Sequence, residues 1–120
     1  MKKSILLAAI ILTVCFTDVS AQTKFMHLTT IESVVGGGVG RSRMIITDEN
    51  GNQKEKGLDN LFSMVGINIS NIKRNENDIL DEISKISSEG WTLISTIPMT
   101  LSPGQNGAGI FMTRYLFAKD

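Results

Sequence analysis

The stretch over residues 75–98 constrains the fold most, because a helix, its end and the following strand can all be read in it. Ile79, Ile83 and Ile86 recur at i, i+4 and i+7, with Leu80 beside them, which is the spacing of one apolar helix face. A helix of this kind gains most of its stability by packing its apolar face on another element. The spacing therefore predicts a helix that packs over a sheet.

The predicted helix has a recognisable start and end. Asn75 or Asn77 is the expected N-terminal cap. Acidic side chains follow, as the positive end of a helix dipole favours: Glu76, Asp78, Asp81 and Glu82. Gly90 is the expected left-handed terminator. Residues 91–97 are rich in β-branched and aromatic side chains, which predicts a strand with Trp91 at the seam between helix and sheet.

Strand-like segments also precede this stretch. Residues 24–35 and 41–47 predict two strands, joined as a long hairpin across the glycine run at 36–40. The segment 48–52 contains Asn-Gly and predicts a tight turn. The charged residues 53–57 are expected to be exposed.

The remaining segments complete a small α+β domain. Residues 58–66 predict a short helix, since apolar residues recur at i, i+3, i+4 and i+7 before Gly66. Residues 52–74 otherwise give no secure placement. A glycine-rich loop is expected over 99–109 and a last strand over 110–118. The predicted fold class is α+β, with a small antiparallel sheet of about four strands on one main helix, plus a short helix.

The last predicted strand is apolar on both faces. One face carries Phe111, Tyr115 and Phe117, and the other carries Ile110, Met112 and Leu116. A strand with one solvated face should alternate apolar with polar residues. The pattern thus predicts either a central strand covered on both sides or a sheet face buried against a second copy. Because two helices give little cover for both faces, we expect self-association.

The N-terminal segment 1–21 resembles a secretory signal peptide. Lys2 and Lys3 precede an apolar run, and cleavage is expected after Ala21, which leaves a single domain over 22–120. The expected location is therefore periplasmic or secreted, with no membrane span after cleavage. Two alternatives are a retained membrane anchor and a lipoprotein attached through Cys15.

Composition excludes several classes of function. Cys15 is the only cysteine and would leave with the signal peptide, so no disulfide and no thiolate site are expected. The chain has 12 basic and 12 acidic side chains. This balance lacks the strong positive field that a nucleic-acid-binding protein needs.

The run GGGVGRSR is a candidate anion site. Consecutive glycines expose backbone N–H groups, and Arg41, Arg43 and Arg114 could hold an anion or small ligand there. Phosphate-binding glycine loops normally open a helix, however, whereas this run precedes a strand-like segment. The alternative is a hairpin tip with solvated arginines.

Signals for catalysis or metal binding are weak. His27 is the only histidine and has no second ligand at metal-binding spacing. No serine or cysteine nucleophile motif accompanies it. We therefore predict no catalytic residue, no metal and no cofactor. Trp91 and Tyr115 are candidates for an interaction surface, and core packing is the alternative for Trp91.

Two short segments resemble a known family. Residues 88–95, SEGWTLIS, followed by RYLF at 114–117, resemble the small bacterial domain-of-unknown-function family 4177. Members usually carry Glu after the Gly-Trp pair, where this chain has Thr92. The resemblance implies an antiparallel sheet with a helix across one face and implies no activity. The functional expectation is an exported, non-catalytic module that associates with itself or with an envelope protein; the alternative is the anion-binding domain described above.

Overall fold

The computed structural model of the chain describes residues 22–34, 42–101 and 109–120. The described part is an α+β fold with one helix and two sheets. Its elements, in chain order, are β1 (Lys24–Val34), β2 (Arg43–Thr47), β3 (Gln53–Gly57), β4 (Phe62–Ser63), β5 (Gly66–Ile67), α2 (Ile69–Ser88), β6 (Thr92–Leu101) and β7 (Gly109–Lys119). The predicted signal peptide and the glycine run lie outside the described residues.

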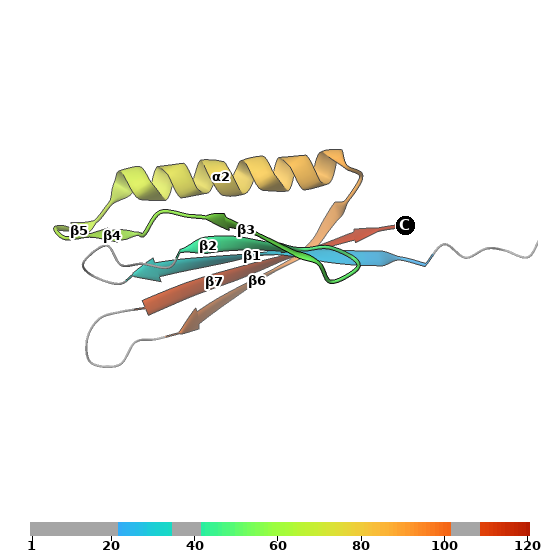
Figure 1. The fold of residues 1–120 in the computed structure, drawn as a ribbon, viewed down its shortest axis with the longest axis horizontal. Coiled ribbons are helices and arrows are strands. Elements are labelled where there is room, and N and C mark those ends of the chain that lie inside the picture. The colour runs from blue at the N-terminus through green and yellow to red at the C-terminus, as the bar shows by residue number, and fades with distance from the viewer. Residues whose placement is uncertain (1–21, 35–41, 102–108) are drawn as a thin grey trace, which may run out of the picture.

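The main sheet is antiparallel and has five strands in the order β3-β2-β1-β7-β6. Helix α2 lies along one side of it (Figure 1). The predicted α+β class and the helix over a sheet are confirmed, while the predicted count of about four strands is one short. The last strand is interior, between β1 and β6, as its apolar faces indicate.

The additional strand is β3, which the sequence predicted only as an exposed charged segment. Its residues are exposed, yet each pairs with β2. The turn before it fixes this pairing, because the Asp48 carboxylate accepts hydrogen bonds from the backbone N–H groups of Asn50 and Asn52 at 2.9 and 2.8 Å. Gly51 adopts a φ of 84°, which glycine tolerates without strain. The charged side chains of β3 suit an edge strand.

The core lies between α2 and the sheet. Its buried apolar members are Met26, Leu28, Met44, Ile79, Ile86, Trp91 and Phe117. Gly90, with a φ of 90°, ends the helix as predicted, and Trp91 then enters the core at the seam. Lys119 holds this end of the helix, since its Nζ donates to the Glu89 carbonyl at 2.8 Å and lies 5.8 Å from the Trp91 ring centroid.

The start of the helix differs from the prediction. Helix α2 begins at Ile69, and its cap is Asn68, whose side chain accepts a hydrogen bond from the Asn71 N–H at 3.2 Å. The first turn contains no acidic residue, so the acidic residues at 76–82 lie in the middle of the helix and do not complement its dipole. Leu80 is also exposed rather than part of the buried face.

The predicted short helix over 58–66 is wrong. Residues 62–67 form the small hairpin β4–β5. Besides the pairing within this hairpin, the Leu61 N–H donates to the Ser33 carbonyl, and the Leu61 carbonyl accepts from the Asn68 N–H. Tertiary hydrogen bonds thus replace the local ones that a helix would need.

Candidate functional site

The main sheet has one face without cover among the described residues. Directly paired residues of antiparallel strands point to the same side of a sheet. Met26 and Leu28 of β1 face α2, so Phe25, His27, Thr29 and Ile31, with the residues paired beside them, form the opposite side, which we term the open face. No described helix or strand lies over it (Figure 1).

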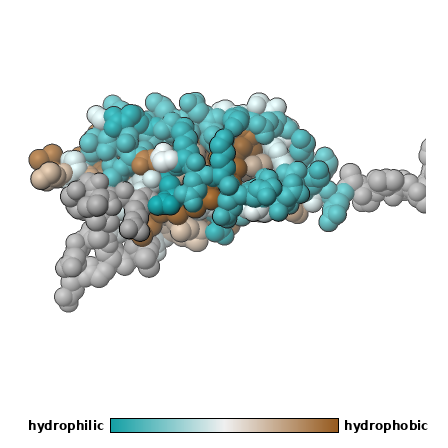
Figure 2. Space-filling view, in the orientation of Figure 1, coloured by the Kyte–Doolittle hydropathy of each residue, from teal (hydrophilic) through white to brown (hydrophobic). Residues whose placement is uncertain are grey.

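The open face carries apolar side chains among polar ones, since the register also places His27, Thr29, Ser33, Thr47 and Ser95 on it. Its apolar side chains, exposed or half-buried, are Phe25, Ile31, Ile45, Ile97, Met99, Ile110, Met112 and Leu116. By contrast, hydrophilic residues cover most of the visible surface of α2 and β3, and hydrophobic residues appear between them and along the sheet margin (Figure 2). Large exposed apolar patches are unusual on monomers and typically mark interaction sites.

Two cations interrupt the apolar surface. Arg114 is exposed, and its Nε donates to the Thr29 hydroxyl at 3.5 Å; within the described residues no carboxylate lies within ion-pair distance of it. Arg43 pairs with Glu55 on β3 at 3.0 Å. Arg114 is therefore a charge in the middle of an apolar face that has no ionic partner of its own among these residues.

His27 on the open face makes folding sensitive to acid. Burial, and secondly the Arg114 guanidinium, lower the pKa of His27 below its ordinary value of 6.5. The unfolded chain then binds a proton more readily, so this contribution to stability is present above pH 6.5 and is lost as pH falls through the lowered pKa. We expect the free energy of unfolding to decrease between pH 7 and 5, and His27→Gln to flatten this dependence in urea titrations. An unchanged slope in the variant would contradict the assignment.

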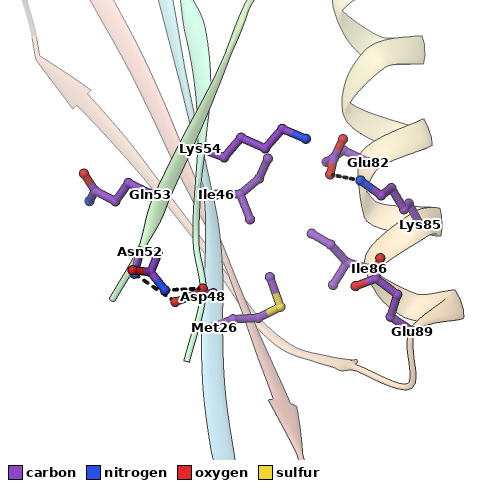
Figure 3. Close-up of a pocket in the computed structure, with 10 residues that line it drawn as sticks. All are labelled: Met26, Ile46, Asp48, Asn52, Gln53, Lys54, Glu82, Lys85, Ile86 and Glu89. Atoms are coloured by element: carbon purple, nitrogen blue, oxygen red, sulfur yellow. Dashed lines mark hydrogen bonds and ion pairs between the residues drawn. The ribbon is translucent and has the colours of Figure 1, made fainter. Parts of the chain in front are cut away.

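A shallow pocket of about 260 Å³ lies on the other side of the sheet, between α2 and the β2–β3 hairpin. Met26, Ile46 and Ile86 point toward one another across it (Figure 3). Part of its charged rim is already paired, since Glu82 contacts Lys85 at 3.5 Å and Asp48 holds the hairpin turn. Lys54 and Glu89 complete the rim. The pocket thus offers an apolar floor under a partly paired charged rim.

The arginines predicted to bind an anion are not gathered into one site. Arg43 on β2 and Arg114 on β7 share the open face, but β1 lies between their strands and they have different partners. Arg41 lies outside the described residues. The shared face, rather than a pocket, is what the two described arginines have in common.

The aromatic candidates lie on the helix side. Trp91 is 8% exposed and belongs to the core, as the core-packing alternative expected. Tyr115 is half-buried against that core, and burial, followed by the charges of Glu76 and Glu32, raises its pKa. Sequence analysis identified the apolar side of the last strand but missed Ile45, Ile97 and Met99. Alternation with Thr96 and Thr100 was the available signal for Ile97 and Met99, whereas Ile45 stands between Met44 and Ile46 and gives no such signal.

Other kinds of site find no support in the described ranges. In 22–34, 42–101 and 109–120, no group of three or more His, Cys, Asp or Glu side chains could hold a metal ion. Within the same ranges, α2 is not long and apolar enough to cross a membrane. Comparisons with protein families, curated proteins and solved structures gave no match to this chain. The resemblance to family 4177 remains a prediction.

Proposed function

We propose that this chain is an exported, non-catalytic binding module that recognises a protein partner through the open face. The observation that carries the proposal is the apolar side of a five-stranded sheet that no described element covers. A protein surface is the ligand suited to such a face, because the face extends across five strands, whereas small-molecule sites are compact and concave. Export is supported by the signal-like segment 1–21.

The non-catalytic part of the proposal is supported by the roles of the charged side chains. In the described part of the chain, four carboxylates pair with a lysine or arginine at 2.7 to 3.5 Å, namely Glu55, Asp59, Asp78 and Glu82. Asp48 holds a turn. His27 is influenced by Arg114 rather than by a carboxylate that could orient it as a general base. These groups have structural partners, and none is arranged to transfer a proton to a substrate.

Site-specific photo-cross-linking in the organism that produces the chain tests the proposal. A photoreactive amino acid replaces Ile97, which is 44% exposed on the open face, or Leu80, which is 61% exposed on the helix. We expect a protein adduct from position 97 and none from position 80. Either another copy or a different protein in the adduct fits the proposal.

A second substitution establishes that the adduct reports specific binding. Met112 lies on the open face, two residues before Arg114, which pairs with Ile97. Met112→Asp places a charge there and should abolish the adduct. Lys73→Glu on the exposed side of α2 should leave it intact. An adduct that survives Met112→Asp, or equal adducts from positions 97 and 80, would contradict recognition through the open face.

A further inference from the structure

We infer that the partner is a second copy of this chain, packed open face to open face with a two-fold axis parallel to β1. The inference rests on the proposed function and names the partner of the same surface. Three features carry it: the charge pattern across the sheet, the pairing that Arg114 requires and the area over which two open faces overlap.

One row across the open face carries opposite charges on opposite sides of β1. The strand register places five residues side by side in the order Glu55, Ile45, Thr29, Arg114 and Ile97. Thr29 belongs to the central strand. Glu55 lies two strands to one side of it, and Arg114 lies one strand to the other side. The row is thus polarised across the sheet.

A two-fold axis parallel to β1 places this row over the same row of the partner subunit, with the order of the strands reversed. Arg114 then lies over Ile45 of the partner subunit, one strand spacing of about 4.8 Å from Glu55 of the partner subunit. The long arginine side chain bridges that spacing, so the dimer gains two equivalent ion pairs. An axis across the strands at this row would instead bring the two Arg114 side chains together. At this row, the charges therefore favour the axis along β1 over one across the strands.

Arg114 needs such a partner if the face is covered. An arginine that loses its water without gaining a carboxylate is strongly unfavourable, whereas a hydrogen-bonded ion pair offsets most of that cost. Its present contact is the Thr29 hydroxyl at 3.5 Å. Glu55 is 56% exposed at its side chain, so it remains accessible although it already pairs with Arg43. A purely apolar partner would leave the guanidinium unpaired.

The overlap between two open faces is of the order that a small protein interface needs. Strands β1 and β7 have 11 residues each and β6 has 10, while β2 and β3 have five each. The axis along β1 lays β7 and β6 over the shorter β2 and β3 of the partner subunit. At about 3.3 Å per residue and 4.8 Å between strands, the two faces therefore overlap over on the order of 500 Å² before side-chain relief is added. Standard protein interfaces bury about 800 Å² per partner. Two such sheets would pack as a sandwich about 10 Å apart, with a helix on each outer side.

Charge reversal tests the partner and the register together. The exported chain is studied by light scattering during size exclusion, and its mass is compared with the intact mass from mass spectrometry. The protein concentration is about 100 μM, which exceeds the dissociation constants of standard interfaces. We expect the mass from light scattering to be twice the mass of one chain. Arg114→Glu and Glu55→Arg should each weaken dimerisation about tenfold or more, and the double variant should bind more tightly than either single variant.

The controls separate folding from association. Lys73→Glu makes the same charge change on α2 and should leave the dimer unchanged. Circular dichroism should show the same secondary structure in every variant. A wild-type ratio of one, a dimer unaffected by Arg114→Glu, or a double variant weaker than both single variants would overturn the inference. A monomer whose position 97 still cross-links a different protein would overturn the inference and leave the proposed function standing.

Discussion

Phe117→Ala is expected to lower the free energy of unfolding by about 3–5 kcal/mol. Phe117 is fully buried and lies in the core cluster between the sheet and α2. It pairs with Met26 on β1 and with Leu93 on β6, so the lost ring leaves a cavity at the centre of three strands. Neighbouring strands are fixed by their ladders and cannot collapse into that space. Urea unfolding followed by circular dichroism measures the loss.

Phe111→Ala is the matched control. Phe111 lies on the same strand and the same side of the sheet, but it is 46% exposed and outside the core cluster. Its replacement should cost no more than about 1 kcal/mol. Equal losses from the two variants would mean that α2 does not cover the sheet where the core residues indicate.

The helix, its end and the next strand could be predicted because their signals are local. The apolar helix face can be recognised from isoleucines in successive turns of the same segment. Gly90 ends the helix through its own backbone conformation. The faces of β7 could also be read, since side chains alternate along any strand. Each of these inferences depends on neighbours within the same segment.

The errors arise where distant partners decide the structure. The charged segment of β3 has no apolar periodicity, and only its pairing with β2 makes it a strand. Residues 58–66 have helical spacing, but the Leu61 backbone bonds to Ser33 and Asn68 instead. The open face could be predicted in part, from β7, because its other strands had to be assembled by register before Ile45 and Ile97 shared a side.

Asn75 shows why a local rule failed and leads to the second large expected effect. An asparagine before an apolar helix pattern predicts a cap, yet Asn75 lies inside α2 and is 1% exposed. Its side chain accepts from the Asp59 N–H and donates to the Asp59 carbonyl, both at 2.8 Å. It also contacts the Glu32 carboxyl at 3.4 Å. One buried amide thus ties the helix to β1 and to the segment before β4.

Asn75→Ala is expected to cost about 2–3 kcal/mol, because both backbone groups of Asp59 lose their partner and a buried unpaired group costs roughly 1–3 kcal/mol. Chemical denaturation measures this loss, and Asn77→Ala on the exposed side of the helix should stay within about 0.5 kcal/mol of wild type.

Asn75→Asp separates the contribution of the side-chain N–H donor from that of the side-chain oxygen acceptor. The carboxylate can still accept from the Asp59 N–H, but it cannot donate to the Asp59 carbonyl and it adds a charge beside Glu32. Burial already raises the pKa of Glu32, so a second carboxylate there is unfavourable while both are ionised. We expect the aspartate variant to be destabilised at pH 7 and to recover part of that loss as pH falls and the pair takes up a proton. A variant as stable as wild type at pH 7 would show that the amide donor does not hold the segment in place.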